Sequence, residues 1–117
     1  MKSVIESLND LNQLILTGKT MEGFEKYYDD EVAMQENSNA PTIGKTANRQ
    51  REIAFYSSIT EFRDAKLLSV AANGNTSFAV WHYDFTHKDW GVRKYTQVSV
   101  QEWKDGKIVR EQFFYGN

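Results

Sequence analysis

The sequence contains no cysteine and only one proline. Without cysteine the chain can form neither a disulfide framework nor a thiol nucleophile, and this composition is typical of a reducing compartment. No run of apolar residues approaches the roughly 18 needed to cross a bilayer, and residues 1–20 have no apolar core of the signal-peptide type. We therefore expect a cytoplasmic protein that does not enter a membrane.

The chain also lacks an excess of either charge. Its 14 Lys and Arg residues are interspersed with 16 Asp and Glu residues, which gives a net charge of −2. A protein that binds nucleic acid or anionic lipid usually carries a basic patch or stripe, so we expect neither partner. The 117 residues contain no linker, repeat or low-complexity tract, and this length predicts one domain over residues 1–117.

Aromatic residues are abundant, with seven Phe, six Tyr and three Trp, most of them in the second half of the chain. Aromatic side chains bury large areas, and Tyr and Trp also carry a polar tip that needs a partner. Such residues can fill a core or form the wall of a ligand pocket. The number of aromatic residues alone leaves both uses open.

The first half of the sequence predicts helices. Ser3 and Glu6 have the spacing of a capping box at the start of an amphipathic helix, and Thr20 can cap a second helix. Three helices are predicted, over residues 2–19, 21–28 and about 45–57. A short strand near residues 32–36 precedes the third helix.

The second half predicts strands. Turn signals at "NG" (73–74), "DWG" (89–91) and "DG" (105–106) divide it. Four long strands follow, over residues 59–72, 76–87, 92–104 and 107–115. Strands of this length must twist and coil. We predict an α+β fold, with a cone-shaped antiparallel sheet of four long strands and one short strand wrapped on three N-terminal helices.

Three stretches resemble the SnoaL-like group of the nuclear-transport-factor-2-like superfamily: "GFEKYYDDEVAMQEN" (23–37), "IGKTANRQRE" (43–52) and "WKDGKIVREQFFY" (103–115). The resemblance covers nearly the whole chain. It implies a cone with a pocket at its open end, and often a dimer through the outer face of the sheet. It does not fix a reaction, because one fold can carry many functions.

Strand alternation indicates which side chains face the hollow of the cone. Aromatic residues mark one face of each long strand, and Gln97 and Glu111 fall on these faces. The predicted inner set is Trp81, Tyr83, Phe85, Tyr95, Gln97, Ser99, Gln101, Trp103, Val109, Glu111, Phe113 and Tyr115. Ile108 falls on the outer face, and a bulge in strand 92–104 would invert the assignment there.

Two polar residues before the long strands also point to the hollow. If Met34 faces inward on the short strand, Glu36 does too. On the third helix a stripe of Ala47, Asn48, Ala54 and Phe55 has Arg51 in its middle. A charge in that position must reach solvent or pair with a carboxylate, and we expect Glu36 or Glu111 as its partner.

The candidate acid–base residues are Glu111 and Glu36, because a carboxyl group in an apolar cavity has its pKa raised and can move protons near neutral pH. Either could instead be a structural ion-pair partner of Arg51. The candidate ligand-binding residues are Tyr28, Asn48, Arg51, Trp81, Tyr83, Gln97 and Tyr115. We expect no histidine on the inner face, no metal site and no cofactor.

Two functions remain open. In the first, the cone binds a small, largely apolar molecule, with or without isomerising, cyclising or dehydrating it by proton transfer. In the second, the protein is a non-catalytic homodimeric interaction or assembly module whose cone is filled by its own side chains. An internal pocket would favour the first, and a cone plugged by Trp81, Trp103 and Phe113 would favour the second. Val98 and Val100 predict an apolar strip for a homodimer on the convex face.

Overall fold

The structure, a computed structural model, describes residues 2–116. Its elements are α1 (Val4–Leu16), α2 (Thr20–Tyr27), β1 (Tyr28–Glu36), β2 (Thr42–Ile43), α3 (Lys45–Ser57), β3 (Ile59–Asn73), β4 (Thr76–His87), β5 (Gly91–Lys104) and β6 (Lys107–Tyr115). The helices and long strands agree with the predicted ranges to within a few residues, so the α+β fold class is confirmed. The prediction missed β2, which has two residues and pairs with β1.

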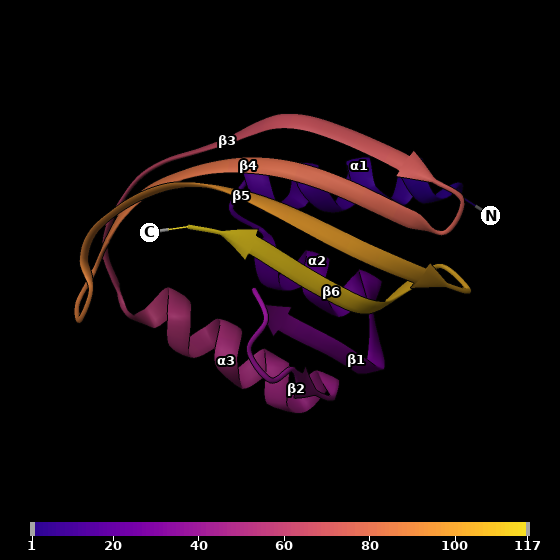
Figure 1. Ribbon diagram of the computed structural model, residues 1–117, viewed down its shortest axis with the longest axis horizontal. Helices are drawn as coiled ribbons and strands as arrows, with labels where there is room; N and C mark the ends of the chain where they lie inside the picture. Colours follow the sequence, from indigo (N-terminus) through magenta and orange to yellow (C-terminus); the bar gives the residue numbers. More distant parts are fainter. Residues whose placement is uncertain (1, 117) are drawn as a thin grey trace.

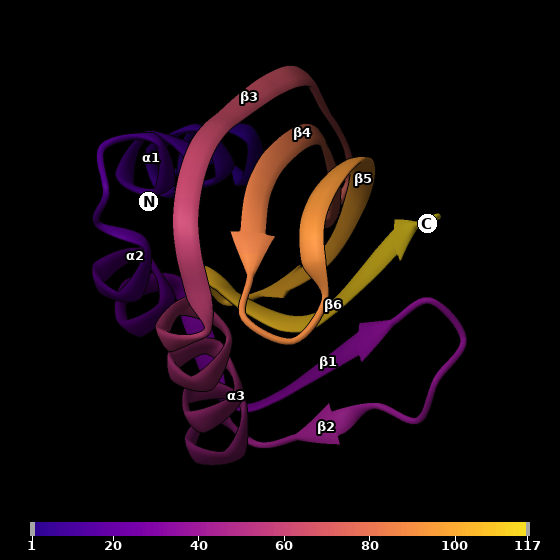
Figure 2. The same cartoon turned by 90° about the vertical axis from the view of Figure 1, so that its left-hand side faces the viewer.

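The strands form one sheet in the order β2-β1-β6-β5-β4-β3. β1 and β6 run parallel, and every other neighbouring pair is antiparallel, so the sheet is mixed and not antiparallel throughout as predicted. Figures 1 and 2 show that this mixed sheet curls strongly but does not close. The curl follows from the length of β3 and β5, which have 15 and 14 residues, because long strands coil.

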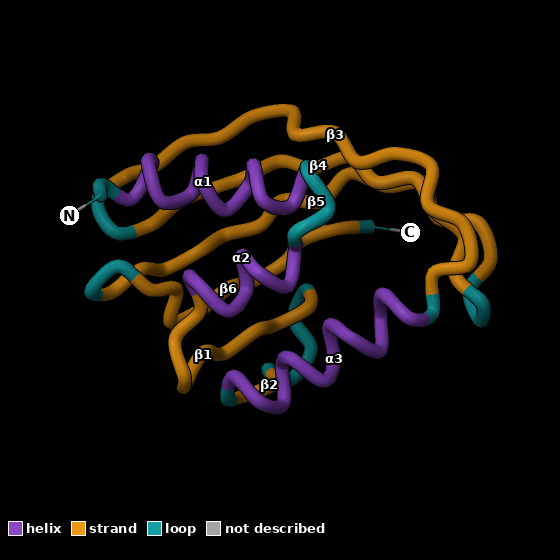
Figure 3. Tube along the Cα trace, turned by 180° about the vertical axis from the view of Figure 1, so that it is seen from behind, coloured by secondary structure: helices purple, strands orange, loops and turns teal. Residues whose placement is uncertain are grey.

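The three helices lie on the concave side of the sheet. In Figure 3, α1 and α2 cross in front of the strands, and α3 lies below them. α3 contacts β1, β2 and β3, so it spans the open side between the two edges of the sheet. No helix within residues 2–116 has the length and apolar character needed to cross a membrane.

A buried apolar cluster fixes α1 and α2 against β1, β5 and β6. It consists of Leu8, Leu11, Phe24, Tyr27, Tyr28, Val32, Met34, Trp103 and Ile108. The apolar positions of α1 recur at helical spacing, which is why one side of this helix can pack into the cluster. This end of the cone is therefore filled.

Helix capping agrees with the prediction at α1 and differs at α2. The Ser3 hydroxyl accepts from the backbone N–H of Glu6, and the Glu6 carboxylate accepts from the backbone N–H of Ser3, which confirms the capping box. The prediction that Thr20 caps α2 is wrong. Thr20 is the first helical residue, and Lys19 holds the cap position without a side-chain hydrogen bond.

The inner face of β5 follows the predicted alternation, but the start of β6 does not. Gln97, Ser99, Gln101 and Trp103 are all buried. On β6 the pairing skips one residue, because Glu102 lies opposite Arg110 whereas Trp103 lies opposite Ile108. This bulge turns Ile108 into the core, where it is fully buried, so its predicted outward position is wrong.

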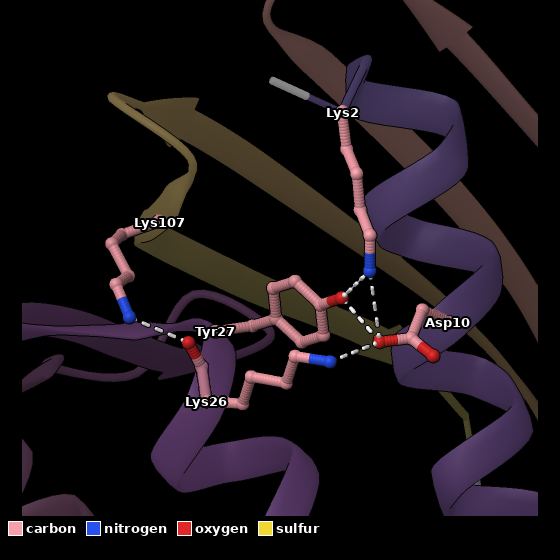
Figure 4. A network of polar contacts seen from close by, with 5 residues as sticks. All are labelled: Lys2, Asp10, Lys26, Tyr27 and Lys107. Carbon is pink, nitrogen blue, oxygen red and sulfur yellow. Dashed lines mark hydrogen bonds and ion pairs between the residues drawn. The ribbon is translucent and has the colours of Figure 1, made fainter.

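A polar network joins α1, α2 and the start of β6 (Figure 4). The buried Tyr27 hydroxyl donates to the Asp10 carboxylate and accepts from Lys2 Nζ at 3.0 Å. Lys26 Nζ also donates to Asp10, at 2.8 Å, and Lys107 Nζ donates to the Lys26 carbonyl at 2.6 Å. The network thus holds the outer surfaces of three elements that the apolar cluster joins inside.

Replacing Tyr27 with Phe tests this network. We expect Tyr27→Phe to lower the free energy of unfolding by about 1 kcal/mol, because the ring still packs on Trp103 but the hydroxyl no longer bonds the carboxylate. Urea unfolding at pH 7 measures the change. An unchanged free energy of unfolding would show that the network adds no stability.

Candidate functional site

The floor of the cone is a chain of hydrogen bonds between buried side chains of β1, β4, β5 and β6. Trp103 Nε1 donates to Ser77 Oγ at 2.8 Å, and Ser77 Oγ donates to Gln101 Oε1 at 2.7 Å. Gln101 Nε2 then donates to Glu111 Oε2 at 2.7 Å, and the Tyr28 hydroxyl donates to Glu111 Oε1. Both oxygens of the Glu111 carboxyl group are thus held by donors.

Glu111 is 3 % exposed, and burial raises the pKa of its carboxyl group to about 7. The hydrogen bonds from Tyr28 and Gln101 oppose this rise, because they favour the charged form, and the negative charge of Glu36 adds to it. Glu111 is therefore a carboxyl group that can gain or lose a proton near neutral pH.

The inner face of α3 differs from the predicted stripe. Ala47 and Ala54 are exposed, whereas Asn48 is fully buried and Arg51, Glu52 and Phe55 are partly buried. These four residues have the spacing i, i+3, i+4 and i+7, which is one face of a helix. The prediction placed the stripe one residue too far round because it favoured alanine over glutamate as an inward residue.

Glu52 is a candidate functional residue that the sequence analysis did not identify. Burial of its carboxyl group is the largest cause that raises its pKa to about 7, and the negative charge of Glu111 is the next. The Arg51 charge opposes the rise. Within residues 2–116 the Glu52 carboxyl group has no hydrogen-bond partner, in contrast to that of Glu111.

Glu36 and Arg51 lie together at the wider part of the cone. Arg51 Nη2 lies 3.8 Å from Glu36 Oε2, so the predicted pairing of Arg51 with Glu36 is confirmed. The Tyr115 hydroxyl donates to the same Glu36 oxygen at 3.4 Å. All three side chains are partly exposed, so this group forms a polar rim.

Asn48 was predicted to bind ligand, but its polar atoms bond the protein itself. Nδ2 donates to the carbonyl oxygens of Val32, Thr42 and Gly44 at distances of 2.9–3.2 Å. Oδ1 accepts from Arg51 Nη1 at 3.2 Å. Asn48 therefore fixes α3 against β1 and β2 and orients Arg51.

An aromatic wall connects the floor to the rim. Trp81 and Tyr83 are stacked at 5.7 Å on β4, Tyr83 lies 5.9 Å from Tyr95 on β5, and Tyr95 lies 5.2 Å from Tyr115 on β6. Gln97 is buried and lies between Trp81 and Tyr115 in the strand register. The structure thus brings Trp81, Tyr83, Gln97 and Tyr115 onto one surface, with Tyr28 and Glu111 deeper in the cone.

The tyrosine hydroxyls of the cone remain protonated at neutral pH. Burial raises the pKa of Tyr28 and Tyr83 well above the usual value, and it raises that of Tyr95 to about 12. The negative charges of nearby carboxylates, and the neighbouring tyrosines, raise these pKa values further. The hydroxyls are therefore hydrogen-bond donors.

The expectation of no histidine on the inner face is wrong. His87 is 5 % exposed at the end of β4 farthest from Ser77, where it stacks on Trp90 at 3.7 Å. His87 Nδ1 accepts from the backbone N–H of Asp89 at 3.1 Å, so this ring fixes the turn between β4 and β5. No group of three His, Asp or Glu side chains in residues 2–116 is arranged to hold a metal ion.

The three side chains expected to plug a filled cone are packed in its interior, so the cone is plugged at these positions. Trp81 and Trp103 are 2 % and 4 % exposed, and Phe113 packs on the apolar cluster. A groove of about 800 Å³, which we call the side groove, opens beside this interior between α3, β3 and the turn from α1 to α2. Its lining includes Leu16, Ile53, Tyr56, Phe62 and Ala65.

Comparisons with known proteins agree with the observed fold. A family model described as a SnoaL-like domain matches residues 3–115. A crystal structure from Mesorhizobium loti, provisionally designated a SnoaL-like polyketide cyclase, is 26% identical with a TM-score of 0.90, and the match covers 97% of this chain and 100% of that chain. No curated protein sequence matches the chain.

Two further crystal structures share the fold at lower identity. One, from Xanthomonas campestris and provisionally designated a polyketide cyclase, is 18% identical with a TM-score of 0.78 over 97% of this chain and 90% of that chain. The other, an NTF-2-like protein of unknown function from Burkholderia xenovorans LB400, is 17% identical with a TM-score of 0.78 over 97% and 83%.

The raised pKa values predict that stability falls as pH rises. An unfolded Glu has a pKa near 4.5, so between this value and about 7 the folded chain keeps protons that the unfolded chain has lost. The stability present below pH 4.5 is then lost as pH rises through 7. We expect Glu52→Gln to raise the free energy of unfolding at pH 8 by up to about 3 kcal/mol and to leave it nearly unchanged at pH 5.

Urea unfolding at pH 5 and pH 8 measures this effect. Glu31→Gln is the matched control, because the same change at an exposed position of β1 should give equal shifts at both pH values. If Glu52→Gln behaves like this control, the Glu52 carboxyl group is solvated and its pKa is not raised.

Proposed function

The chain belongs to the SnoaL-like family, and from this premise we propose that its cone binds a small, largely apolar molecule and moves a proton on it with a carboxyl group. The observation that carries the proposal is the presence of two carboxyl groups, Glu52 and Glu111, whose pKa values are raised to about 7 in one interior. A proton-transfer group works best when its pKa lies near the working pH. Proton transfer of this kind needs no cofactor.

The two carboxyl groups suit different roles. Glu111 is bonded at both oxygens, which fixes its position, whereas Glu52 has no hydrogen-bond partner among the described residues. We therefore assign proton transfer with the ligand to Glu52. Glu111 raises the pKa of Glu52 by its charge and is the second proton-accepting group in the cone.

The ligand class follows from the wall and the rim. Tyr83 and Tyr95 offer aromatic faces to a planar or alicyclic molecule, and the buried Trp81 stacks on Tyr83 and supports it. Tyrosine hydroxyls and the Gln97 amide can donate to an oxygen that gains negative charge when a proton is removed next to a carbonyl group. Enolisation of this kind underlies isomerisation, cyclisation and dehydration, and two structurally similar proteins are provisionally designated polyketide cyclases.

Glu36, Arg51 and Tyr115 complete the proposed site at its solvent side. Arg51 is paired with Glu36, and the neutral Tyr115 hydroxyl donates to Glu36, so the three residues add polarity without a net charge. This suits a ligand that is neutral overall. Asn48 contributes by positioning Arg51.

A model reaction tests the proton-transfer function without knowledge of the natural substrate. A carboxylate base removes the C3 proton of 5-nitrobenzisoxazole while the N–O bond breaks, which yields a nitrile and a coloured phenolate. We expect saturable catalysis whose kcat rises with pH through about 7, as Glu52 loses its proton. Glu52→Gln should lower kcat at least about 100-fold, because one positioned general base contributes roughly that factor.

Glu31→Gln again serves as the control and should leave kcat and KM unchanged. A rate that stays linear in substrate and is equal in Glu52→Gln and the wild type would contradict the proposal. It would show that the reaction takes place at surface carboxylates.

The convex face of the sheet supports a second function, homodimer formation. Phe78, Val80, Val98 and Val100 form neighbouring cross-strand pairs there, and Phe114 lies opposite Val98 with 44 % of its surface exposed. An apolar strip across three strands is typical of a protein–protein contact. We propose that two copies pack through this strip, with or without catalysis in the cone.

Light scattering after size-exclusion chromatography tests the dimer. We expect twice the chain mass at micromolar concentration, and we expect Val98→Lys to give monomers because it places a charge in the apolar contact. Val92→Lys, at an exposed valine near the start of β5, is the control and should remain dimeric. A monomeric wild-type protein would overturn this role of the convex face.

A further inference from the structure

The side groove collects large apolar side chains that are exposed. Leu16, Ile53, Tyr56 and Phe62 all line it, and each exposes between 41 % and 57 % of its surface. They come from α1, α3 and β3, so the exposure is a shared feature of three elements and not one misplaced side chain. Binding an apolar group in such a hollow is favourable, because apolar surface on both sides is removed from water.

The floor of the side groove is part of the same concave face as the aromatic wall of the cone. Phe62 and Ala65 of β3 line the groove, and in the strand register they lie opposite Phe85 and Tyr83 of β4. Tyr83 in turn belongs to the wall. One continuous inner surface thus runs from the groove into the proposed ligand site.

Tyr56 stands between the two spaces. Its residue is 41 % exposed in the groove, yet burial and the charge of Glu52 both raise the pKa of its hydroxyl. A hydrogen bond with Thr20, which also lines the groove, lowers this pKa. Tyr56 therefore lines the groove, and its hydroxyl is close enough to Glu52 for the charge of that carboxyl group to act on it.

The charges around the groove indicate what it can hold. Lys19 and Arg63 are balanced by Glu22 and Asp64, and Arg63 Nε is already bonded to Asp84 at 2.8 Å. The groove thus offers no uncompensated charge to an ionic group. Its volume and its apolar lining suit an uncharged hydrocarbon chain.

We propose that the side groove binds the apolar tail of the molecule whose polar head lies at Glu52 in the cone. This inference rests on the proposed function and refines its ligand class to elongated molecules with one polar end. The head is recognised by the polar groups of the cone, and the tail passes Tyr56 onto Ile53, Leu16 and Phe62. Tail length is then a determinant of affinity.

A series of 4-alkylphenols, from 4-ethylphenol to 4-hexylphenol, tests the inference by calorimetric titration. We expect affinity to rise about fourfold with each added methylene, since burying one is worth roughly 0.8 kcal/mol. The double variant Leu16→Gln/Ile53→Gln should weaken 4-hexylphenol at least about tenfold and leave 4-ethylphenol within about twofold. Both positions are partly exposed, so the fold should tolerate them.

Two controls separate the outcomes. Ile43→Gln alters an isoleucine that is 62 % exposed on β2, outside the groove, and should not change any affinity. Glu52→Gln replaces the carboxylate acceptor of the phenol hydroxyl with a weaker, neutral amide oxygen and should weaken every member of the series by the same factor.

The results distinguish the two proposals. If the double variant binds 4-hexylphenol as tightly as the wild type, the groove does not hold the tail, and the proposed function is unaffected provided that Glu52→Gln still weakens binding. If Glu52→Gln changes no affinity, or if no alkylphenol binds, the head does not lie at Glu52. The proposed function and the inference that rests on it are then both overturned.

Discussion

One continuous chain of side-chain hydrogen bonds joins four neighbouring strands inside the cone, and the geometry of the interior depends on it. It runs from Trp103 through Ser77 and Gln101 to Glu111, which also accepts from Tyr28. A carboxyl group without water is costly to bury unless donors surround it, so the network must form as a unit. Its consequence is a rigid floor that fixes where the aromatic wall begins.

Asn48 and Glu111 together determine the surroundings of Glu52. A residue on α3 can face the interior only if the helix is held at a fixed rotation, and the Asn48 bonds to three backbone carbonyls supply that constraint. Glu52 then lies one turn after Asn48, where the negative charge of Glu111 raises its pKa. Glu111 is stabilised by two donors of the fold, whereas no donor among residues 2–116 bonds the Glu52 carboxyl group.

The sequence predicted the fold better than the site, for a physical reason. Turn chemistry is local: Asp105 and Gly106 adopt the positive φ angles of 52° and 79° of a tight hairpin, and this dipeptide is recognisable without any structure. Alternation then carried the facing of β4 and β5 correctly. It failed at Ile108, because a bulge depends on how two strands pair and leaves no mark in one strand's own residues.

The error on α3 has a different origin. An apolar stripe is found by asking which residues avoid water, and this question places alanines inside and a glutamate outside. The true face, from Asn48 to Phe55, contains two charged residues because the surface that it meets is not an ordinary core. A carboxyl group facing inward beside another costs stability, and a fold that only needed packing would place an apolar side chain there. The mismatch between hydrophobic pattern and burial at Glu52 is therefore what distinguishes this interior from an ordinary apolar core.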